Sequence, residues 1–306
     1  MSAPNILATG SSGFIGRNVV KHLTENGQPV TGLDLLAPPE PHPDGVSSLV
    51  CDLRHGKLPD QPFPLVVHLA ALGGVRPSME RPLQYFETNL RALIRLLEHA
   101  RKHGLRRIVF ASSSSVYGDN MGTPSREDDP LLPRSPYALT KLQGEQWGRM
   151  FAEMHDIDFI ALRFFAVWGP GQRPDLALES FRRKILAGET ITIHGDGTQR
   201  RDLTHVSDVA RAVEAALAWK GKGFAAFNIG TGMNHSVNDM LRAAEEWTGM
   251  KAQVHYGPAH PADVTSTLAD VSKAREELGW EAQLPFHSTS HSSTYFNCAG
   301  CCGERG

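Results

Sequence analysis

The amino-acid sequence predicts an α/β fold, a doubly wound parallel sheet with a smaller C-terminal lobe. Apolar runs of strand length alternate with helix-length amphipathic segments, which is the pattern of a parallel sheet with helices on both sides. Most of these runs are continuously apolar rather than alternating, as is typical of strands that are covered on both faces. A glycine-rich turn after the first run is a third indication.

Six strands are expected in the first part of the chain. Two amphipathic segments between them, Leu83–His103 and Pro136–His155, are expected to be helical. Segment Ala37–Gly45 contains four prolines and a glycine, so we expect a loop there. The expected strands are Asn5–Thr9, Val30–Asp34, Ser48–Leu53, Leu65–Leu69, Arg107–Ser112 and Phe159–Phe164.

The pattern is less regular after Phe165, where Gly169-Pro170-Gly171 marks a turn. We expect residues 1–166 and about 202–232 to form the sheet domain, and about 167–201 and 233–285 to form the lobe. Residues 286–306 are expected to be a disordered or atypical tail. The expected elements here are helices Leu176–Ala187, Ser207–Trp219 and Ser236–Trp247, the last two with serine caps, and strands Thr190–His194 and Phe224–Gly230.

The composition restricts the partners and the compartment. The 306 residues are 41% apolar and 21% charged, with a formal net charge of −2, so we expect no general affinity for nucleic acid or anionic membrane. No apolar stretch reaches the roughly 18 residues of a membrane span and no secretory signal is visible, so a cytoplasmic protein is expected. Three of the four cysteines crowd the tail at spacings that suit zinc poorly, so no metal is expected.

The turn Gly10-Ser11-Ser12-Gly13-Phe14-Ile15-Gly16 follows the first strand and opens the first helix. Glycines at this spacing allow a tight turn, a close backbone approach to a pyrophosphate and close packing of helix on strand. The helix N-terminus then faces the phosphates with its partial positive charge. This context favours the dinucleotide-binding turn of a Rossmann domain over a plain glycine turn.

Two acidic residues follow at strand ends. Asp34 ends the second expected strand, where a carboxylate can accept the ribose hydroxyls of NAD and would repel the 2′-phosphate of NADP. The alternative role of Asp34 is to cap the turn that follows. Asp52, at the end of the third expected strand, is a candidate for the adenine edge.

Tyr137 and Lys141 are four residues apart at the start of a helix, which places the phenol and the ammonium on one helical face. A cation about 4 Å away favours the phenolate by about 4 kcal/mol at an effective dielectric near 20. We therefore expect Lys141 to lower the pKa of Tyr137 enough for it to act as a base. The serine run Ser112–Ser115 leaves the fifth strand at its carboxyl end, where such sheets place ligands.

In order and spacing, these segments resemble the extended short-chain dehydrogenase/reductase family, and within it the NAD-dependent nucleotide-sugar epimerases. The resemblance covers about residues 4–285. The matching segments are Thr9–Gly16, Asp34, His68–Ala71, Asn89, Ala111–Gly118, Tyr137–Lys141, Arg163–Pro170, Gly195–Gly197, Arg201–Asp202, Asn228–Gly232 and Ala269–Trp280.

A homodimer is expected, and the helix Leu83–His103 is a candidate for part of its interface. The resemblance implies roles for individual residues. The implied catalytic residues are Ser113, Tyr137 and Lys141. Ser114 and Ser115 would contact the sugar, and Arg201 would clamp the pyrophosphate of a UDP-sugar. The implied NAD contacts are Gly10, Gly13, Phe14, Ile15, Gly16, Asp34, Asp52, Leu53, Leu69, Ala70, Ala71, Tyr137 and Lys141.

Several segments look like those of UDP-glucuronate 4-epimerases. Galactose-type 4-epimerases usually carry an Asn where this chain has Ala166, and an Arg before a Pro-Gly-Asp run where it has His260-Pro261-Ala262-Asp263. Arg76 and Arg173 are candidate partners of a sugar carboxylate, because an arginine fork matches that group. A surface ion pair and a phosphate contact are the alternatives for each.

The expected reaction has no net redox change: Tyr137 takes the proton of the sugar 4-hydroxyl while hydride passes to NAD, and the 4-ketose takes hydride back on its other face. The alternatives are a UDP-glucose or UDP-GlcNAc 4-epimerase, a 4-ketoreductase or dehydratase, and a non-catalytic NAD-sensing protein. Ser113-Ser114-Ser115 lacks the Asp-Glu pair usual in 4,6-dehydratases, and Asp34 argues against an NADPH-dependent reductase.

Overall fold

The computed structural model describes residues 4–119, 123–259 and 263–286, and in these residues seven strands form one parallel sheet. The strand order β10-β6-β5-β4-β1-β2-β3 reverses between β1 and β4, which confirms the doubly wound arrangement. The strands are β1 (Ile6–Thr9), β2 (Val30–Asp34), β3 (Ser47–Val50), β4 (Leu65–His68), β5 (Arg107–Ser113), β6 (Asp158–Phe164) and β10 (Phe224–Ile229).

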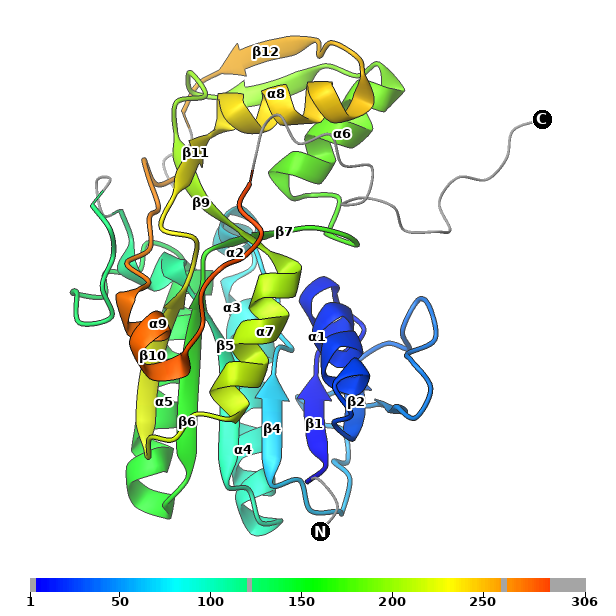
Figure 1. Cartoon of the computed structure of the whole chain (residues 1–306), viewed down its shortest axis with the longest axis vertical. Coiled ribbons are helices and arrows are strands. Elements are labelled where there is room, and N and C mark those ends of the chain that lie inside the picture. Colours follow the sequence, from blue (N-terminus) through cyan, green and yellow to red (C-terminus); the bar gives the residue numbers. More distant parts are fainter. Residues whose placement is uncertain (1–3, 120–122, 260–262, 287–306) are drawn as a thin grey trace.

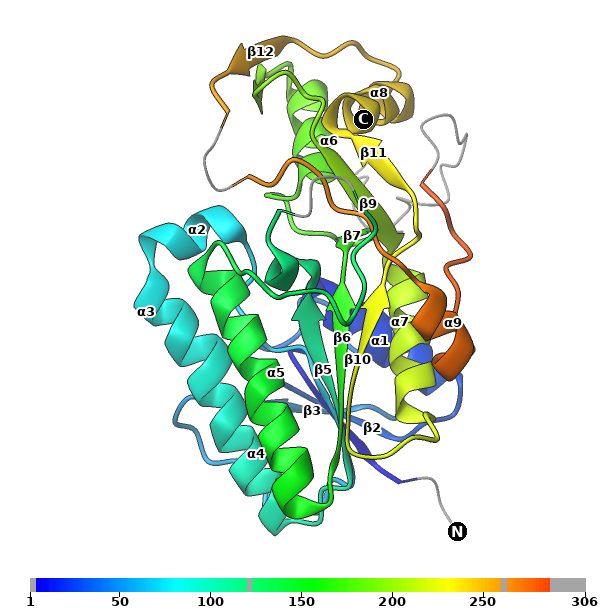
Figure 2. The same ribbon diagram turned by 90° about the vertical axis from the view of Figure 1, so that its left-hand side faces the viewer.

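Helices cover both faces of this sheet (Figures 1 and 2). Helices α1 (Phe14–Glu25) and α7 (Val206–Leu217) pack together on one face, and α4 (Ala92–Lys102) and α5 (Pro136–His155) lie on the other. Successive residues of a strand point to opposite faces, so Ile6 joins the core under α1 and Leu7 joins the core under α4. This is why the strand sequences are continuously apolar.

The smaller lobe lies beyond the carboxyl ends of the strands (Figure 1). In the described part of the lobe, helices α6 (Ala177–Ala187) and α8 (Val237–Thr248) pack against each other. A capping box between Ser236 and Asp239 begins α8, as the expected serine cap predicted. The lobe strands are β7 (Ala166–Trp168), β9 (Arg200–His205) and β11 (Asn234–Ser236) in one sheet and β8 (Ile191–His194) and β12 (Val254–Gly257) in another.

Three expected elements differ in the structure. Strand β3 ends at Val50 and is largely exposed at the sheet edge, so Asp52 lies beyond it rather than at its end. The expected helix Leu83–His103 is interrupted: α2 (Val75–Glu80) and α3 (Pro82–Tyr85) lead into a π-helical turn, Phe86–Arg91, before α4. Helix α7 is capped by His205, whose ring nitrogen accepts the Ser207 N–H, and not by Ser207.

The C-terminal part of the described chain returns to the first domain. Helix α9 (Ser272–Leu278) packs on α7 and β10, and Ala274 and Trp280 are buried in the core that α1 and α7 share. Residues 272–282 therefore pack with the sheet domain, although the sequence placed them in the lobe. Phe286 is also not part of a disordered tail, because its ring is buried against Trp168 and Trp247. The rest of the expected tail, 287–306, lies outside the described residues.

Candidate active site

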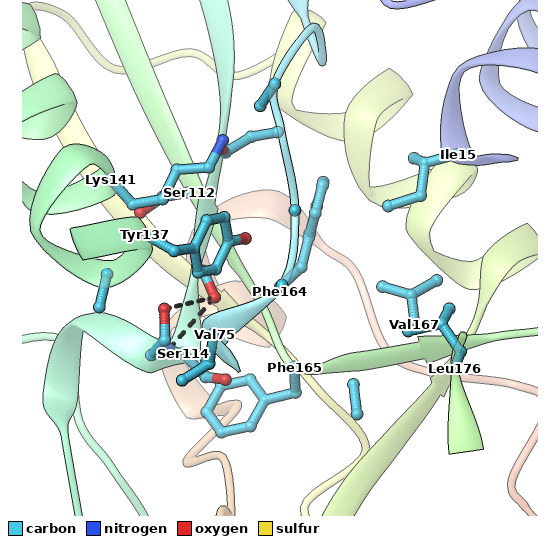
Figure 3. Close-up of a pocket in the computed structure, with 18 of the residues that line it drawn as sticks. Ile15, Val75, Ser112, Ser114, Tyr137, Lys141, Phe164, Phe165, Val167 and Leu176 are labelled. Atoms are coloured by element: carbon cyan, nitrogen blue, oxygen red, sulfur yellow. Dashed lines mark hydrogen bonds between the residues drawn. The ribbon is translucent and has the colours of Figure 1, made fainter. Parts of the chain in front are cut away.

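A cavity of about 540 Å³ opens between the carboxyl end of the sheet and the lobe, a size that suits a small ligand or cofactor. Tyr137, Ser112 and Ser114 gather on one side of it, and Ile15, Val167 and Leu176 lie across (Figure 3). The predicted site residues that line the cavity are Gly10, Gly13, Phe14, Ile15, Gly16, Leu69, Ala71, Ser113, Ser114, Ser115, Tyr137, Lys141, Arg173 and Arg201.

The glycine turn has the geometry that a dinucleotide diphosphate needs. Gly10 adopts a φ of +72°, which side chains other than glycine rarely tolerate. A Cβ on Gly16 would lie 1.9 Å from the Gly10 carbonyl oxygen, so only glycine allows the helix to start this close to β1. Gly13 is the N-cap of α1 and offers no side-chain cap, which leaves N–H groups of the first turn to bind an anion.

Four other predicted NAD contacts lie outside this cavity lining. The Asp34 carboxylate ends β2 and accepts N–H bonds from Ser12 (2.9 Å) and Leu36 (3.3 Å). Asp34 therefore caps the turn, which is the alternative role inferred for it from the sequence. A carboxylate also has further acceptor positions that remain for the ribose hydroxyls. The Arg54 guanidinium donates hydrogen bonds to the Asp52 carboxylate, the shortest of them 2.7 Å long, and these bonds lower the pKa of Asp52 to about 2. Leu53 is buried, and Ala70 donates its N–H to Thr9.

Local sequence fixes where α5 presents its polar groups. The Ser135 hydroxyl caps the helix by accepting the Ala138 N–H at 3.1 Å, and Pro136 occupies the first helical position. Tyr137 therefore lies in the first turn and Lys141 one turn later, both facing the cavity. The Lys141 ammonium donates to the Ala111 carbonyl oxygen at 2.6 Å and lies 5.9 Å from the centre of the Tyr137 ring.

Burial dominates the acid–base properties of this pair. It raises the pKa of Tyr137, and a hydrogen bond with Ser113 and the positive charge of Arg173 offset part of that rise. The same burial lowers the pKa of Lys141 to about 7, against the opposing effect of Glu145. The expectation that Lys141 lowers the pKa of Tyr137 is therefore not met, because desolvation disfavours both charged forms.

The three candidate arginines occupy different environments. Arg76, on α2, is paired with Asp263 (2.7 Å) and is not among the described residues that line the cavity. Arg173 lines it and is paired with Asp175 (2.7 Å), and its guanidinium lies against Gly73. Arg201 also lines the cavity and forms no ion pair with any described carboxylate. Arg173 is thus the candidate carboxylate partner that reaches the Tyr137 side of the cavity.

Sequence reasoning missed the segment that closes the cavity from the lobe side. Asp263, Val264 and Thr267 line it, and a backbone bridge between Ser125 and Ala269 holds their segment against the first domain. The segment is irregular and has no periodicity, and residues 260–263 were notable in the sequence only as a departure from the Pro-Gly-Asp run of galactose-type enzymes. Phe164, the last residue of β6, and Phe165, which follows it, also line the cavity.

Neither a metal cluster nor a membrane-spanning helix is found in the described residues. Within residues 4–119, 123–259 and 263–286, no cluster of His, Cys, Asp and Glu could hold a metal ion. Cys298, Cys301 and Cys302 lie outside the described residues. Of the helices in the described chain, none is both long and apolar enough to span a bilayer.

Comparison with known proteins places the chain in a family. Residues 6–230 match the model of the "NAD dependent epimerase/dehydratase family". A UDP-glucuronate 4-epimerase of Thermodesulfobacterium geofontis is 34% identical, over 91% of each chain. Structures of MoeE5 with NAD and either UDP-glucuronic acid or UDP-glucose share 42% identity and a TM-score of 0.86, covering 92% of this chain and 94% of MoeE5.

A third relative is the UDP-glucuronic acid 4-epimerase of Bacillus cereus, solved with UDP-glucuronic acid and NAD. It shares 32% identity and a TM-score of 0.84, over 92% of this chain and 94% of that one. The family match, these near-complete alignments and the glycine cradle agree. The chain belongs to the NAD-dependent epimerase/dehydratase family.

Proposed function

We propose that this NAD-dependent nucleotide-sugar epimerase inverts C4 of UDP-glucuronate to give UDP-galacturonate. The observation that carries the proposal is Arg173, which lines the same cavity as Ser113 and Tyr137. Asp175 takes the Nε and one Nη2 donor of Arg173, so three of the five guanidinium donors remain for a sugar carboxylate. An arginine–carboxylate contact is charge-assisted and favours an acid over an alcohol.

Two further points support an acidic sugar. Ala166 lines the cavity and brings no amide where galactose-type enzymes usually have an Asn. Two of the similar proteins named above are UDP-glucuronate 4-epimerases. MoeE5 has been solved with both the acid and the neutral sugar, so the preference has to be measured.

The roles of the residues follow from the reaction. Tyr137 takes the proton of the 4-hydroxyl and later returns one to the 4-ketose, and the Ser113 hydroxyl holds the same oxygen in line. In its protonated form, Lys141 stabilises the Tyr137 phenolate. Arg201 holds the diphosphate of UDP while the sugar turns.

NAD fits the glycine cradle, where Gly10, Gly13 and Gly16 would admit its diphosphate and Asp34 its adenosine ribose. When bound, NAD supplies the acceptor and donor of the hydride at C4. Because the reaction has no net redox change, the residues around the cradle must keep the cofactor through the cycle. Purified protein is therefore expected to convert UDP-sugars without added NAD.

The test compares two arginines on two sugars. Arg173→Ala should lower kcat/KM for UDP-glucuronate at least about 30-fold more than for UDP-glucose, since an unpaired charge costs about 2 kcal/mol. Arg275→Ala is the matched control, because Arg275 is paired with Glu281 and neither residue lines the cavity, and it should not discriminate. A wild-type preference for UDP-glucose, or equal losses on both sugars in Arg173→Ala, would reject the glucuronate assignment.

We also propose that the enzyme is a homodimer, formed through the outer face of α3, the π-helical turn and α5. Leu139, Met150 and Met154 recur along one face of α5, and all three are exposed. Leu83 and Phe86 are exposed on the neighbouring turn. These helices lie at the surface with no described element in front of them (Figure 2), and an apolar face of this kind suits a second copy.

A further inference from the structure

A buried ion pair contacts the serine run Ser112–Ser115 through Ser112, and the reaction as described so far does not use it. Glu145 on α5 and Arg163 on β6 are each only 4% exposed. The Arg163 guanidinium donates two bonds to the Glu145 carboxylate, at 3.0 and 2.7 Å. The Ser112 hydroxyl donates a third bond to the same carboxylate.

The cluster extends through neutral partners to the far edge of the sheet. Arg163 also donates to the Tyr117 hydroxyl at 2.8 Å and to the Glu127 carbonyl oxygen at 3.1 Å. Tyr117 in turn donates to the Asn228 side chain at 2.6 Å. Every member of this network has a partner, so the segment from Ser112 to Tyr117 is held at both of its ends.

Burying such a pair is expensive, and a well-packed apolar pair would often stabilise a fold as well or better. Its position is therefore informative. Ser112 is the residue before Ser113, and successive strand residues point to opposite faces. Fixing the Ser112 hydroxyl on Glu145 therefore fixes the rotation of the strand end that presents Ser113 to the cavity.

Glu145 also follows Lys141 by one helical turn, which places both side chains on one face of α5. The carboxylate favours the protonated form of that lysine. Titratable and charged groups on neighbouring elements also face Lys141 and Tyr137. Among the described side chains, His68 of β4 faces Lys141, and Tyr85 of α3 and Arg173, after β7, face Tyr137. Arg163 of β6 faces Glu145, and Glu127 faces Arg163.

We propose that Glu145 is a positioning residue for the reaction: its carboxylate orients the strand end that carries Ser113 and keeps Lys141 cationic beside Tyr137. The proposal rests on the proposed role of Tyr137 as the base. It does not depend on which UDP-sugar is the substrate. Glu145 acts through Ser112 and Lys141, and it is not among the residues that line the cavity in the described chain.

The decisive variant is Glu145→Gln, which keeps the size and an acceptor but removes the negative charge. Lys141 and Arg163 are then cations without their shared counter-ion, and the surroundings of both Lys141 and Tyr137 are more positive. Lys141 therefore loses its proton at a lower pH, and the Tyr137 phenolate forms at a lower pH while Lys141 is still protonated. Both limbs of the kcat/KM pH profile should therefore move by about one unit toward acid. The absorbance of the Tyr137 phenolate is measured as the difference between each enzyme and the same enzyme carrying Tyr137→Phe. It should appear at a lower pH in Glu145→Gln than in the wild-type protein.

Ser112→Ala separates the two parts of the proposal, because it removes the strand tie and no charge. Its kcat should fall by about 10- to 100-fold through misplacement of Ser113, with both pH limbs unmoved. Glu145→Asp keeps the charge on a shorter side chain. It should keep the wild-type pH limbs at a reduced kcat, and it remains informative if Glu145→Gln does not fold.

The matched control is the ion pair Arg107–Asp158, which joins the same strands, β5 and β6, at their other end, 2.7 Å apart. Asp158→Asn should lower the unfolding midpoint without moving the pH profile. Unmoved limbs in Glu145→Gln, or an equal shift in Asp158→Asn, would overturn the charge role. Wild-type kcat in both Ser112→Ala and Glu145→Asp would overturn the orienting role. An active Tyr137→Phe would instead reject the proposed function itself.

Discussion

At the residue scale, the Tyr137 phenol is enclosed by the groups that control its proton. Ser113 bonds to it, the Tyr85 ring meets it edge-on with centroids 6.3 Å apart, and Arg173 acts on it electrostatically. Tyr137→Phe keeps the ring that Tyr85 contacts and removes only the hydroxyl. Turnover should therefore fall by at least about 100-fold, while NAD binding, measured by fluorescence titration, stays near wild type. Loss of both NAD and fold in this variant would contradict a purely chemical role.

Cofactor choice depends on Asp34. Asp34→Asn keeps an oxygen that can accept the Ser12 N–H but removes the charge that repels a 2′-phosphate. The turn should survive, the affinity for NAD should fall modestly, and the bias against NADP should shrink. Titration of wild type and variant with both dinucleotides checks this. Equal binding of NAD and NADP by the wild-type protein would contradict the ribose assignment.

Residues whose roles depend on local spacing could be predicted from the sequence. Gly16, Tyr137 and Lys141 lie where the glycine turn and the helical repeat of four place them. Arg76 could not be resolved in this way, because its partner Asp263 is 187 residues away in the chain. The pKa of Tyr137 was predicted in the wrong direction, because spacing shows a nearby charge and does not show how far burial outweighs it.

At the element scale, α5 serves two surfaces at once. Its inner face carries Tyr137 and Lys141, and its outer face carries Leu139, Met150 and Met154, the last of them 66% exposed. Met154→Glu should convert the proposed homodimer to monomers, because a charge cannot be buried there without a partner. Sedimentation velocity measures the change. Met250→Glu, at an exposed methionine of the lobe, is the control and should leave the mass unchanged. A wild-type monomer would contradict the proposed interface.

The interruption before α4 shows what an amphipathic pattern cannot reveal. Asn89 lies in the π-helical turn and points inward, where it donates to the Leu72 carbonyl oxygen (3.0 Å) and the Thr140 hydroxyl (3.1 Å) and accepts the Leu72 N–H. The wider turn allows a polar side chain to face the core between apolar neighbours. It ties the segment after β4 to α5, next to Tyr137. The apolar period alone predicts one continuous helix here.

At the scale of the whole molecule, the parallel doubly wound sheet and the helices on both of its faces followed from the sequence, and the course of the C-terminal segment did not. Trp280 donates to the Asp208 carbonyl oxygen at 3.0 Å, and the N–H groups of Gln283 and Leu284 bond to the Asp208 carboxylate. Six residues after Trp280, Phe286 is buried in the lobe. A few residues of irregular chain therefore connect the two domains, with contacts too distant in sequence for any local pattern to indicate.

Phe286 should accordingly be needed by the lobe and not by the NAD domain. Its ring packs on Trp168, Trp247 and His235, and Trp168 directly follows Ala166 and Val167 of the cavity wall. Phe286→Ala removes a buried aromatic ring, which costs about 3–5 kcal/mol. We expect a lower unfolding midpoint and a higher KM for the UDP-sugar, with the affinity for NAD unchanged.

Phe227→Ala is the matched control, because Phe227 is as deeply buried but belongs to the core that the sheet shares with α1 and α7. It should lower stability by a similar amount through a cavity in the sheet domain and should weaken NAD binding as well, because α1 presents its first turn to the cofactor. Denaturant titrations, NAD fluorescence and initial rates on each variant distinguish the two domains. If Phe286→Ala weakened NAD binding as much as Phe227→Ala does, the lobe would not be a separate unit of substrate binding, and the closing segment would belong to one cooperative core.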